Sequence, residues 1–142
     1  MRPGTWVVLE GPYGAFTRHA RSTESVALIG AGVGLTPLRA LLEDLPPWVD
    51  VTVLVRGSTE DAIVHRHELV AMVEGRRGRF HQLIGPREHV RLDTAALRRL
   101  VPDIAHRDVY VCGPEGFNDS VVGAASRLGT PPERIHRETF AL

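Results

Sequence analysis

The sequence predicts an α/β domain in which a parallel sheet of about five strands is flanked by helices on both faces, in three layers. Three observations support this prediction. Short, β-branched apolar runs alternate with segments of helical spacing, as in successive strand–helix units. Two of the apolar runs are followed at once by glycine and proline. A chain of 142 residues that is 43% hydrophobic can also bury one core of common size.

The apolar runs have the length and composition of strands that are buried on both faces of a sheet. We expect strands at Trp6–Leu9, Val26–Ile29, Val51–Val55, Arg79–Ile84, Val109–Cys112 and Ile135–Phe140.

Helical spacing appears between these runs. Leucines recur from Leu38 to Leu45 until Pro46-Pro47 ends the helix. A second helix is expected before Gly75, with Ile63, Leu69, Met72 and Val73 on one face and Ser58 or Thr59 as its cap. Two further helices are predicted at Thr94–Leu100 and Asp119–Leu128.

Residues 1–22 differ from the rest, because the strand Trp6–Leu9 has no helix of its own and stops at a turn containing Gly11, Pro12 and Gly14. A polar connector, Thr17–Ser25, follows. Residues 1–22 therefore look like either the tail of a preceding domain or an accessory strand, and residues 23–142 are expected to form the domain proper.

Composition excludes several classes of function. The 17 basic residues, all arginine, balance 17 acidic ones, so no overall field attracts nucleic acid or an anionic membrane. One cysteine, Cys112, permits no internal disulfide and suits a reducing, cytosol-facing compartment. There is no apolar run of the ~20 residues that span a bilayer, and because the segment "MRPGTWVVLEG" lacks the long apolar core of a signal peptide, we expect none. His65 and His67 are interpreted as surface residues, and no metal site is expected.

The segment "IGAGVGLTPL", residues 29–38, follows a predicted buried strand. Its glycines allow a ligand to approach the backbone, and the next helix offers free N–H groups and the positive end of its dipole, which favours a diphosphate. We expect Thr36 to cap that helix and Pro37 to occupy its first position. The glycine spacing departs from the usual dinucleotide motif.

No acid directly follows the second strand of the expected nucleotide fold, where one would hold a ribose hydroxyl. Arg56 and Ser58 stand there instead, so the choice between NADH and NADPH stays open. Near the C-terminus, "VYVCGPEGF" places Cys112 at the end of a buried strand. In the final "HRETFAL", Glu138 and Phe140 share one strand face.

Four segments, taken in order, resemble the nicotinamide-binding half of the ferredoxin–NADP⁺ reductase superfamily, and the resemblance covers nearly the whole chain. The segments are "EGPYGAF", "IGAGVGLTPLRALL", "VYVCGPEGF" and "HRETFAL". The similarity is greatest to the C-terminal regions of bacterial ferric reductase-like transmembrane proteins, and it includes "LVPDIAHRDVYVCGP". The resemblance implies a Rossmann-like fold. It also implies that Cys112 and Glu138 are catalytic residues beside the nicotinamide. The implied cofactor contacts are Gly30, Ala31, Gly32, Val33, Gly34, Thr36, Pro37, Arg56, Ser58, Gly113, Pro114, Glu115, Phe117 and Phe140.

As this resemblance implies, the full enzyme would pass a hydride from NAD(P)H to FAD, and then single electrons to haem, ferric iron or another acceptor. Trp6–Gly14 resembles only the final strand and junction of the family's FAD-binding barrel, and nothing in the chain matches the barrel's Arg-x-Tyr-Ser/Thr motif. Residues 1–22 are therefore expected to be the last strand and junction of that preceding barrel. FAD and its domain are expected partners, with a haem-bearing membrane domain as a further one. We expect a cytoplasmic location, at the membrane face if such a domain precedes. The alternatives are a soluble oxygenase reductase with an iron–sulfur partner, and a non-catalytic nucleotide-binding regulator.

Overall fold

The computed structural model describes residues 7–8, 17–86 and 90–141. The strands are β1 (Val7–Val8), β2 (Ser25–Ala31), β3 (Asp50–Gly57), β4 (Arg79–Ile84), β5 (Asp108–Pro114) and β6 (Ile135–Ala141). The α-helices are α1 (Leu35–Asp44), α2 (Arg66–Gly75), α3 (Thr94–Leu100) and α4 (Glu115–Arg127). Short 3₁₀ turns lie at Arg18–Ala20, Gly32–Gly34, Glu60–Ala62, Ile104–His106 and Pro132–Arg134. The predicted turn at Gly11–Gly14 lies outside the described residues.

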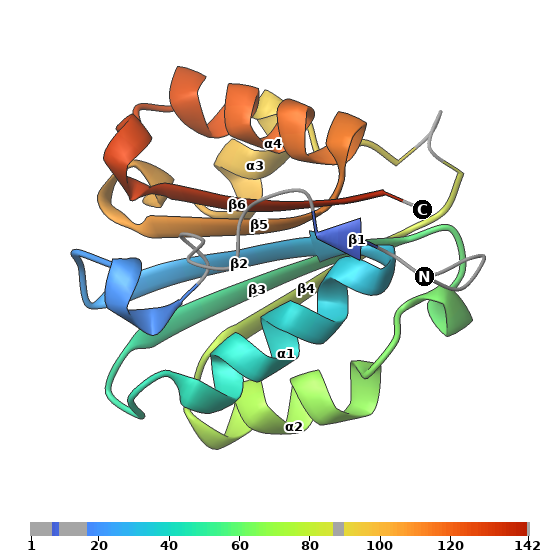
Figure 1. The fold of residues 1–142 in the computed structure, drawn as a ribbon, viewed down its shortest axis with the longest axis horizontal. Coiled ribbons are helices and arrows are strands. Elements are labelled where there is room, and N and C mark those ends of the chain that lie inside the picture. Colours follow the sequence, from blue (N-terminus) through green and yellow to red (C-terminus); the bar gives the residue numbers. More distant parts are fainter. Residues whose placement is uncertain (1–6, 9–16, 87–89, 142) are drawn as a thin grey trace.

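The strands form one sheet in the order β1-β6-β5-β2-β3-β4. β2 to β6 are parallel, and β1 pairs antiparallel with β6. Figure 1 shows α1 and α2 on one face of the sheet and α3 and α4 on the other. The predicted three-layer, Rossmann-like α/β fold is therefore confirmed, with the two-residue β1 added at one edge.

Two apolar clusters, one on each face of the sheet, explain why the central strands have continuous apolar sequences. In β2, Val26 and Leu28 belong to the cluster under α1 and α2, whereas Ala27 and Ile29 belong to the cluster under α3 and α4. All four side chains have no exposed area. A strand that is covered on both faces has no position left for a polar side chain.

The first helix begins earlier than predicted. The N–H group of Leu35 donates to the carbonyls of Gly32 and Val33, so the helical path begins at Gly32 and continues into α1. Thr36 is thus inside the helix and caps nothing, and Pro37 is not its first residue. Pro37 is still tolerated, because the N–H groups of a first helical turn have no intrahelical acceptor.

Two other helix starts also differ from prediction. α2 begins at Arg66, after His65 in a left-handed conformation (φ 59°), so neither Ser58 nor Thr59 caps it. α4 begins at Glu115, directly after β5, because Pro114 has an extended backbone and forms the boundary itself. The connection between β5 and α4 is therefore shorter than the prediction of a helix beginning at Asp119 implied.

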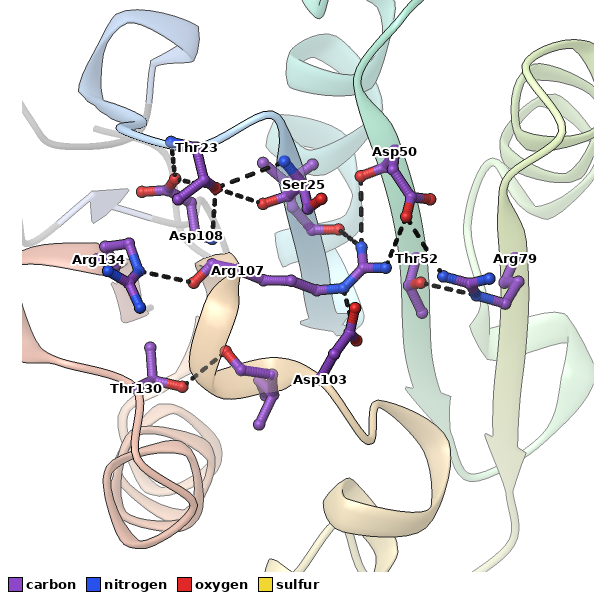
Figure 2. A network of polar contacts seen from close by, with 12 residues as sticks. Thr23, Ser25, Asp50, Thr52, Arg79, Asp103, Arg107, Asp108, Thr130 and Arg134 are labelled. Carbon is purple, nitrogen blue, oxygen red and sulfur yellow. Dashed lines mark hydrogen bonds and ion pairs between the residues drawn. The ribbon is translucent and has the colours of Figure 1, made fainter.

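The amino-terminal ends of the parallel strands are held together by Arg107, whose side chain has no exposed area (Figure 2). Its guanidinium donates to the carbonyl of Val26 at 2.9 Å, to the carboxylate of Asp50 at 2.8 Å and to that of Asp103 at 2.9 Å. These groups come from β2, β3 and the loop before β5. One planar fork therefore connects three neighbouring segments, and it holds the pKa of Asp103 below its usual value.

Asp108, fully buried at the start of β5, fixes the connector before β2 (Figure 2). Its carboxylate accepts hydrogen bonds from the backbone N–H groups of Ser22 and Thr23 and the hydroxyl of Thr23, and it lies 2.9 Å from His136 Nε2. Burial alone would raise the pKa of Asp108, but the bonds from His136, Thr23 and Ser22 outweigh it and lower the pKa. The ionised carboxylate thus stabilises the fold.

None of the helices in the described ranges has the length and apolar character needed to cross a membrane.

Replacing Arg107 with lysine should lower the free energy of unfolding by at least about 2 kcal/mol, because an ammonium group cannot satisfy three acceptors arranged for a fork. Urea denaturation measures this difference. Arg98→Lys, on the exposed side of α3, is the matched control. Equal stability of the two variants would contradict the role assigned to Arg107.

Asp108 should make the fold sensitive to acid. Its pKa is depressed in the folded state, so its contribution is complete above the unfolded pKa of about 3.9 and is lost as the pH falls through the lower folded value. Asp108→Asn should therefore be less stable than the original chain at pH 7 and should lose less stability between about pH 5 and pH 2. Asp61→Asn, at an exposed site, serves as control. An unchanged pH profile in Asp108→Asn would argue against this assignment.

Candidate nucleotide-binding site

The predicted site residues gather at the carboxyl-terminal edge of the sheet, opposite Arg107. The glycine loop follows β2, Ser58 follows β3, and Glu115 follows β5. On β6, Glu138 is in register with Cys112 of β5. These strands are neighbours in the order β6-β5-β2-β3, and ligands of open parallel sheets bind at this edge.

The three glycines of the loop meet different requirements. A Cβ atom on Gly30 would lie 2.3 Å from Leu38, and one on Gly34 would lie 2.1 Å from the carbonyl oxygen of Cys112. Packing of α1 and of β5 therefore excludes side chains at both positions. Gly32 has φ +59°, and its Cβ would meet no heavy atom within 4 Å. It is exposed, so Gly32 is where the loop backbone lies open to a ligand.

The early start of the helix places its first N–H groups on the loop itself. Because Ala31 precedes the helical path, the residues of its first turn are Gly32, Val33 and Gly34. N–H groups in a first turn lack intrahelical acceptors and lie at the positive end of the dipole. The loop can therefore offer backbone donors to an anion.

Thr36 and Pro37 lie one turn further along α1. The Thr36 hydroxyl is exposed and lies 3.2 Å from Nε2 of His65, a residue that the sequence suggested was merely a surface histidine. His65 has a left-handed backbone, and its Nδ1 is 3.7 Å from Glu68, which also pairs with Arg39. These polar contacts connect the start of α1 with the start of α2 beside the glycine loop.

Arg56 makes hydrogen bonds to the backbone at the carboxyl-terminal edge of the sheet. Its guanidinium donates to the carbonyl of Val90 at 3.3 Å and to that of Gly85 at 3.4 Å, and so links the end of β3 to the segment after β4. Both acceptors are neutral, so the positive charge of Arg56 stays uncompensated by them. Ser58 is exposed just beyond it.

Cys112 is fully buried in the apolar cluster that also contains Phe140. Burial, and after it the neighbouring charge of Glu138, raises the pKa of the thiol. A neutral, buried thiol is a poor nucleophile, so the structure favours a packing or positioning role for Cys112. Glu138 is partly exposed and borders a hollow of about 620 Å³ beside α1.

Asn118, which sequence reasoning did not single out, connects the ends of β5 and β6. Its side chain is fully buried, and Nδ2 donates to the carbonyls of Gly113 and Glu138, at 3.1 and 2.7 Å, and to the hydroxyl of Thr139 at 3.1 Å. Its Oδ1 has no hydrogen-bond partner among the described residues. Only its place directly before the predicted helix Asp119–Leu128, beside the Cys-Gly-Pro motif, could have indicated this role.

A cavity of about 580 Å³ opens on the α3 and α4 side of the same edge, a size typical of ligand pockets. Four predicted contacts border it: Ala31, Arg56, Pro114 and Phe117. Phe117 also packs beneath the turn, since a Cβ on Gly113 would lie 2.9 Å from its ring. The remaining lining residues are Val90, Arg91, Leu92, Asp93, Thr94, Gly116, Asp119, Ser120, Val121, Ala124 and Arg127.

Comparison with known proteins finds related oxidoreductases and flavohemoproteins. An NADPH oxidoreductase of Mycobacterium tuberculosis is 30% identical over 145 residues, which cover 100% of this chain and 38% of that protein. A flavohemoprotein of Bacillus subtilis is 27% identical over 159 residues, covering 99% of this chain and 38% of its own. The chain thus spans well under half of these relatives.

Among solved structures, the flavohem-like FAD/NAD binding domain of nitric oxide dioxygenase from Vibrio cholerae is similar, with a TM-score of 0.66 and 29% identity over 81% of this chain and 50% of that one. The model of the oxidoreductase NAD-binding domain family matches residues 28–123, from β2 into α4. The predicted resemblance to the ferredoxin–NADP⁺ reductase superfamily is confirmed, and this chain belongs to the oxidoreductase NAD-binding domain family.

Proposed function

We propose that this chain binds the nicotinamide cofactor of a flavin-dependent reductase, with the diphosphate over Gly32. The observation that carries the proposal is the open face of Gly32, where an added Cβ atom would meet no heavy atom within 4 Å, while Gly30 and Gly34 are both packed. The proposal assigns the diphosphate to the N–H groups of the turn Gly32–Gly34.

The remainder of the edge fits the two halves of a dinucleotide. The cavity of about 580 Å³ begins at Ala31, the residue before Gly32, and extends along α4. In the proposal this cavity takes the adenosine half. The nicotinamide half lies toward Cys112 and Glu138, on the other side of the glycine loop in the strand order.

When bound, the nicotinamide would supply a hydride, and residues of this chain would orient the nicotinamide ring. Cys112 fills the floor of the site without ionising, because burial raises the pKa of its thiol. Glu138 places a carboxylate beside it, and Asn118 fixes the backbone carbonyl of Glu138. Orientation of the reacting groups is the contribution that such residues make to hydride transfer.

The acceptor of the hydride in this proposal is FAD, held by a further domain. Two of the similar proteins support it: the Vibrio cholerae structure is an FAD/NAD binding domain of which this chain matches half, and the flavohemoprotein is much longer than this chain. Residues 1–22 would then be the end of the FAD domain, with β1 docked on β6. FAD would then supply single electrons to haem, ferric iron or another acceptor.

The single cysteine, a free thiol, favours a cytoplasmic setting. If a haem-bearing transmembrane domain precedes the FAD domain, the proposal places this chain at the cytoplasmic face of the membrane.

Gly32→Glu should abolish binding of NADH and NADPH, since a carboxylate would occupy the position of the diphosphate. Calorimetry on this chain measures the affinities. Gly32→Ala separates backbone strain from bulk and charge, and Gly75→Glu, at the open end of α2, controls for the added carboxylate. Unchanged affinity in a folded Gly32→Glu variant would overturn the proposed site.

Cys112→Ser should slow hydride transfer in a reductase that contains this domain and its FAD domain, while changing the dissociation constant of the nicotinamide cofactor less. The reason is that a serine hydroxyl in the apolar surroundings of position 112 should shift the nicotinamide ring that lies against it. Stopped-flow reduction of the flavin measures the rate, and Cys112→Ala distinguishes lost volume from added polarity. An undiminished rate in both variants would argue against a positioning role.

A further inference from the structure

His65 links the first turn of α1 to the start of α2, beside the glycine loop. Its Nε2 lies 3.2 Å from the hydroxyl of Thr36, and its Nδ1 lies 3.7 Å from the carboxylate of Glu68. The two helices lie on the same face of the sheet (Figure 1). The imidazole ring therefore stands between a hydroxyl and a carboxylate, and each of its nitrogens faces one of them.

The backbone of His65 holds the ring in this place. His65 directly precedes α2 and has a left-handed conformation (φ 59°), which residues with a Cβ atom seldom adopt. Its side chain is partly buried, whereas Thr36 is exposed. The ring is thus fixed against α2, and the hydroxyl that it contacts is open to a ligand.

Among the described residues, Glu68 is the charged group that faces the ring. Glu68 also pairs with Arg39 of α1, and this hydrogen bond is the main cause that lowers the pKa of Glu68. Arg66, the residue after His65, pairs with Glu60 at 3.4 Å instead. Glu68 is therefore ionised at neutral pH, and its charge favours a proton on Nδ1 over a lone pair there.

With a proton on Nδ1, the state of Nε2 decides what the Thr36 hydroxyl can do. If Nε2 carries no proton, it is an acceptor, and the hydroxyl donates its proton to it. If Nε2 is protonated, it donates to the hydroxyl oxygen, and the hydroxyl proton is free for another acceptor. Histidine commonly changes between these states near neutral pH. One proton on Nε2 thus converts Thr36 from a donor to His65 into a donor to a ligand.

The side chain of Thr36 leans toward the glycine loop. The helical path runs from Gly32 into α1, so Thr36 follows Gly32 by four residues and shares its face of the helix. Side chains on a helix tilt toward its N-terminus, and the Thr36 side chain therefore covers the turn that contains Gly32. A diphosphate at that turn would accept a hydrogen bond from the Thr36 hydroxyl.

We propose that His65 is a positioning residue for the diphosphate: protonated at both nitrogens, it holds the Thr36 hydroxyl as a donor to the ligand, so that binding takes up a proton at Nε2. The inference rests on the proposed function, because it takes the turn Gly32–Gly34 as the site of the diphosphate. The negative charge of the ligand also favours the imidazolium form. Because the bound state holds the extra proton, affinity falls as the pH rises through the range in which histidine loses its proton.

The test is calorimetric titration of this chain with ADP-ribose, whose diphosphate does not itself titrate near neutral pH. Titrations at about pH 7 in Tris and in PIPES, which differ in ionisation enthalpy, give the number of protons taken up. We expect uptake of a fraction of one proton, approaching one as the pH rises. The affinity at about pH 8.5 should be about three- to tenfold lower than at about pH 6, the value of one hydrogen bond.

His65→Asn should make the affinity independent of pH in this range and abolish the proton uptake. Asparagine tolerates a left-handed backbone, but its shorter side chain does not reach Thr36. His67→Asn removes an exposed histidine of α2 two residues away and is the matched control, which should keep the uptake and the pH dependence. Thermal unfolding of each variant checks its fold.

Thr36→Val removes the hydroxyl and leaves the backbone of His65 unchanged, so it tests the same contact even if His65→Asn does not fold. It should reduce the proton uptake. In the Thr36→Val background, His65→Asn should change the affinity less than it does in the original chain, because His65 acts through the hydroxyl.

No proton uptake by the original chain, or equal uptake in the original chain and a folded His65→Asn variant, would overturn the inference. An effect of His65→Asn that is undiminished in the Thr36→Val background would overturn the positioning role and indicate a direct contact instead. If ADP-ribose binds and Gly32→Glu abolishes that binding, the proposed function stands in each of these cases. If ADP-ribose does not bind at all, the proposed function and the inference both fail.

Discussion

The contact between the glycine loop and the end of β5 determines the geometry of the proposed site. Gly34 lies so near the carbonyl of Cys112 that any Cβ atom would be 2.1 Å from it. This packing presses the first helical turn against β5 and leaves Gly32 as the open position of the loop. It also sets the glycine loop beside the Cys112–Glu138 register pair, so the loop and the proposed hydride-transfer residues share one rigid edge.

The two edges of the sheet use arginine in opposite ways. At the amino-terminal edge, Arg107 is buried, and carboxylates and a carbonyl accept its hydrogen bonds (Figure 2). At the carboxyl-terminal edge, Arg91 and Arg127 have no carboxylate partner among the described residues, and the nearby acids are engaged with other groups. The first arrangement stabilises the fold without a ligand. The second leaves positive charge available to bind a ligand.

The central strands β2, β3 and β5 were predictable from sequence because burial on both faces of a sheet demands continuous apolar runs. The helix starts were not. Thr36 is chemically a good capping residue. The preceding residues Gly32–Gly34 already follow a helical path, so the N-cap position lies before Thr36. Asn118 and Arg107 act through groups distant in sequence, 20 and 57 residues away, which local patterns do not report. The glycine and Cys-Gly-Pro motifs located the edge, whereas the cavity lined by Arg91 and Arg127 arises only when α3 and α4 pack together.

The most direct test of the central claim is an NMR titration of the ¹⁵N-labelled chain with ADP-ribose, which contains the diphosphate and the adenosine half without nicotinamide. The account predicts that the largest amide shifts fall on Gly32, Val33 and Gly34, with smaller ones on Gly116 beside the cavity. Shifts confined to the opposite edge around Asp108, or none at a saturating concentration, would contradict binding at the glycine loop.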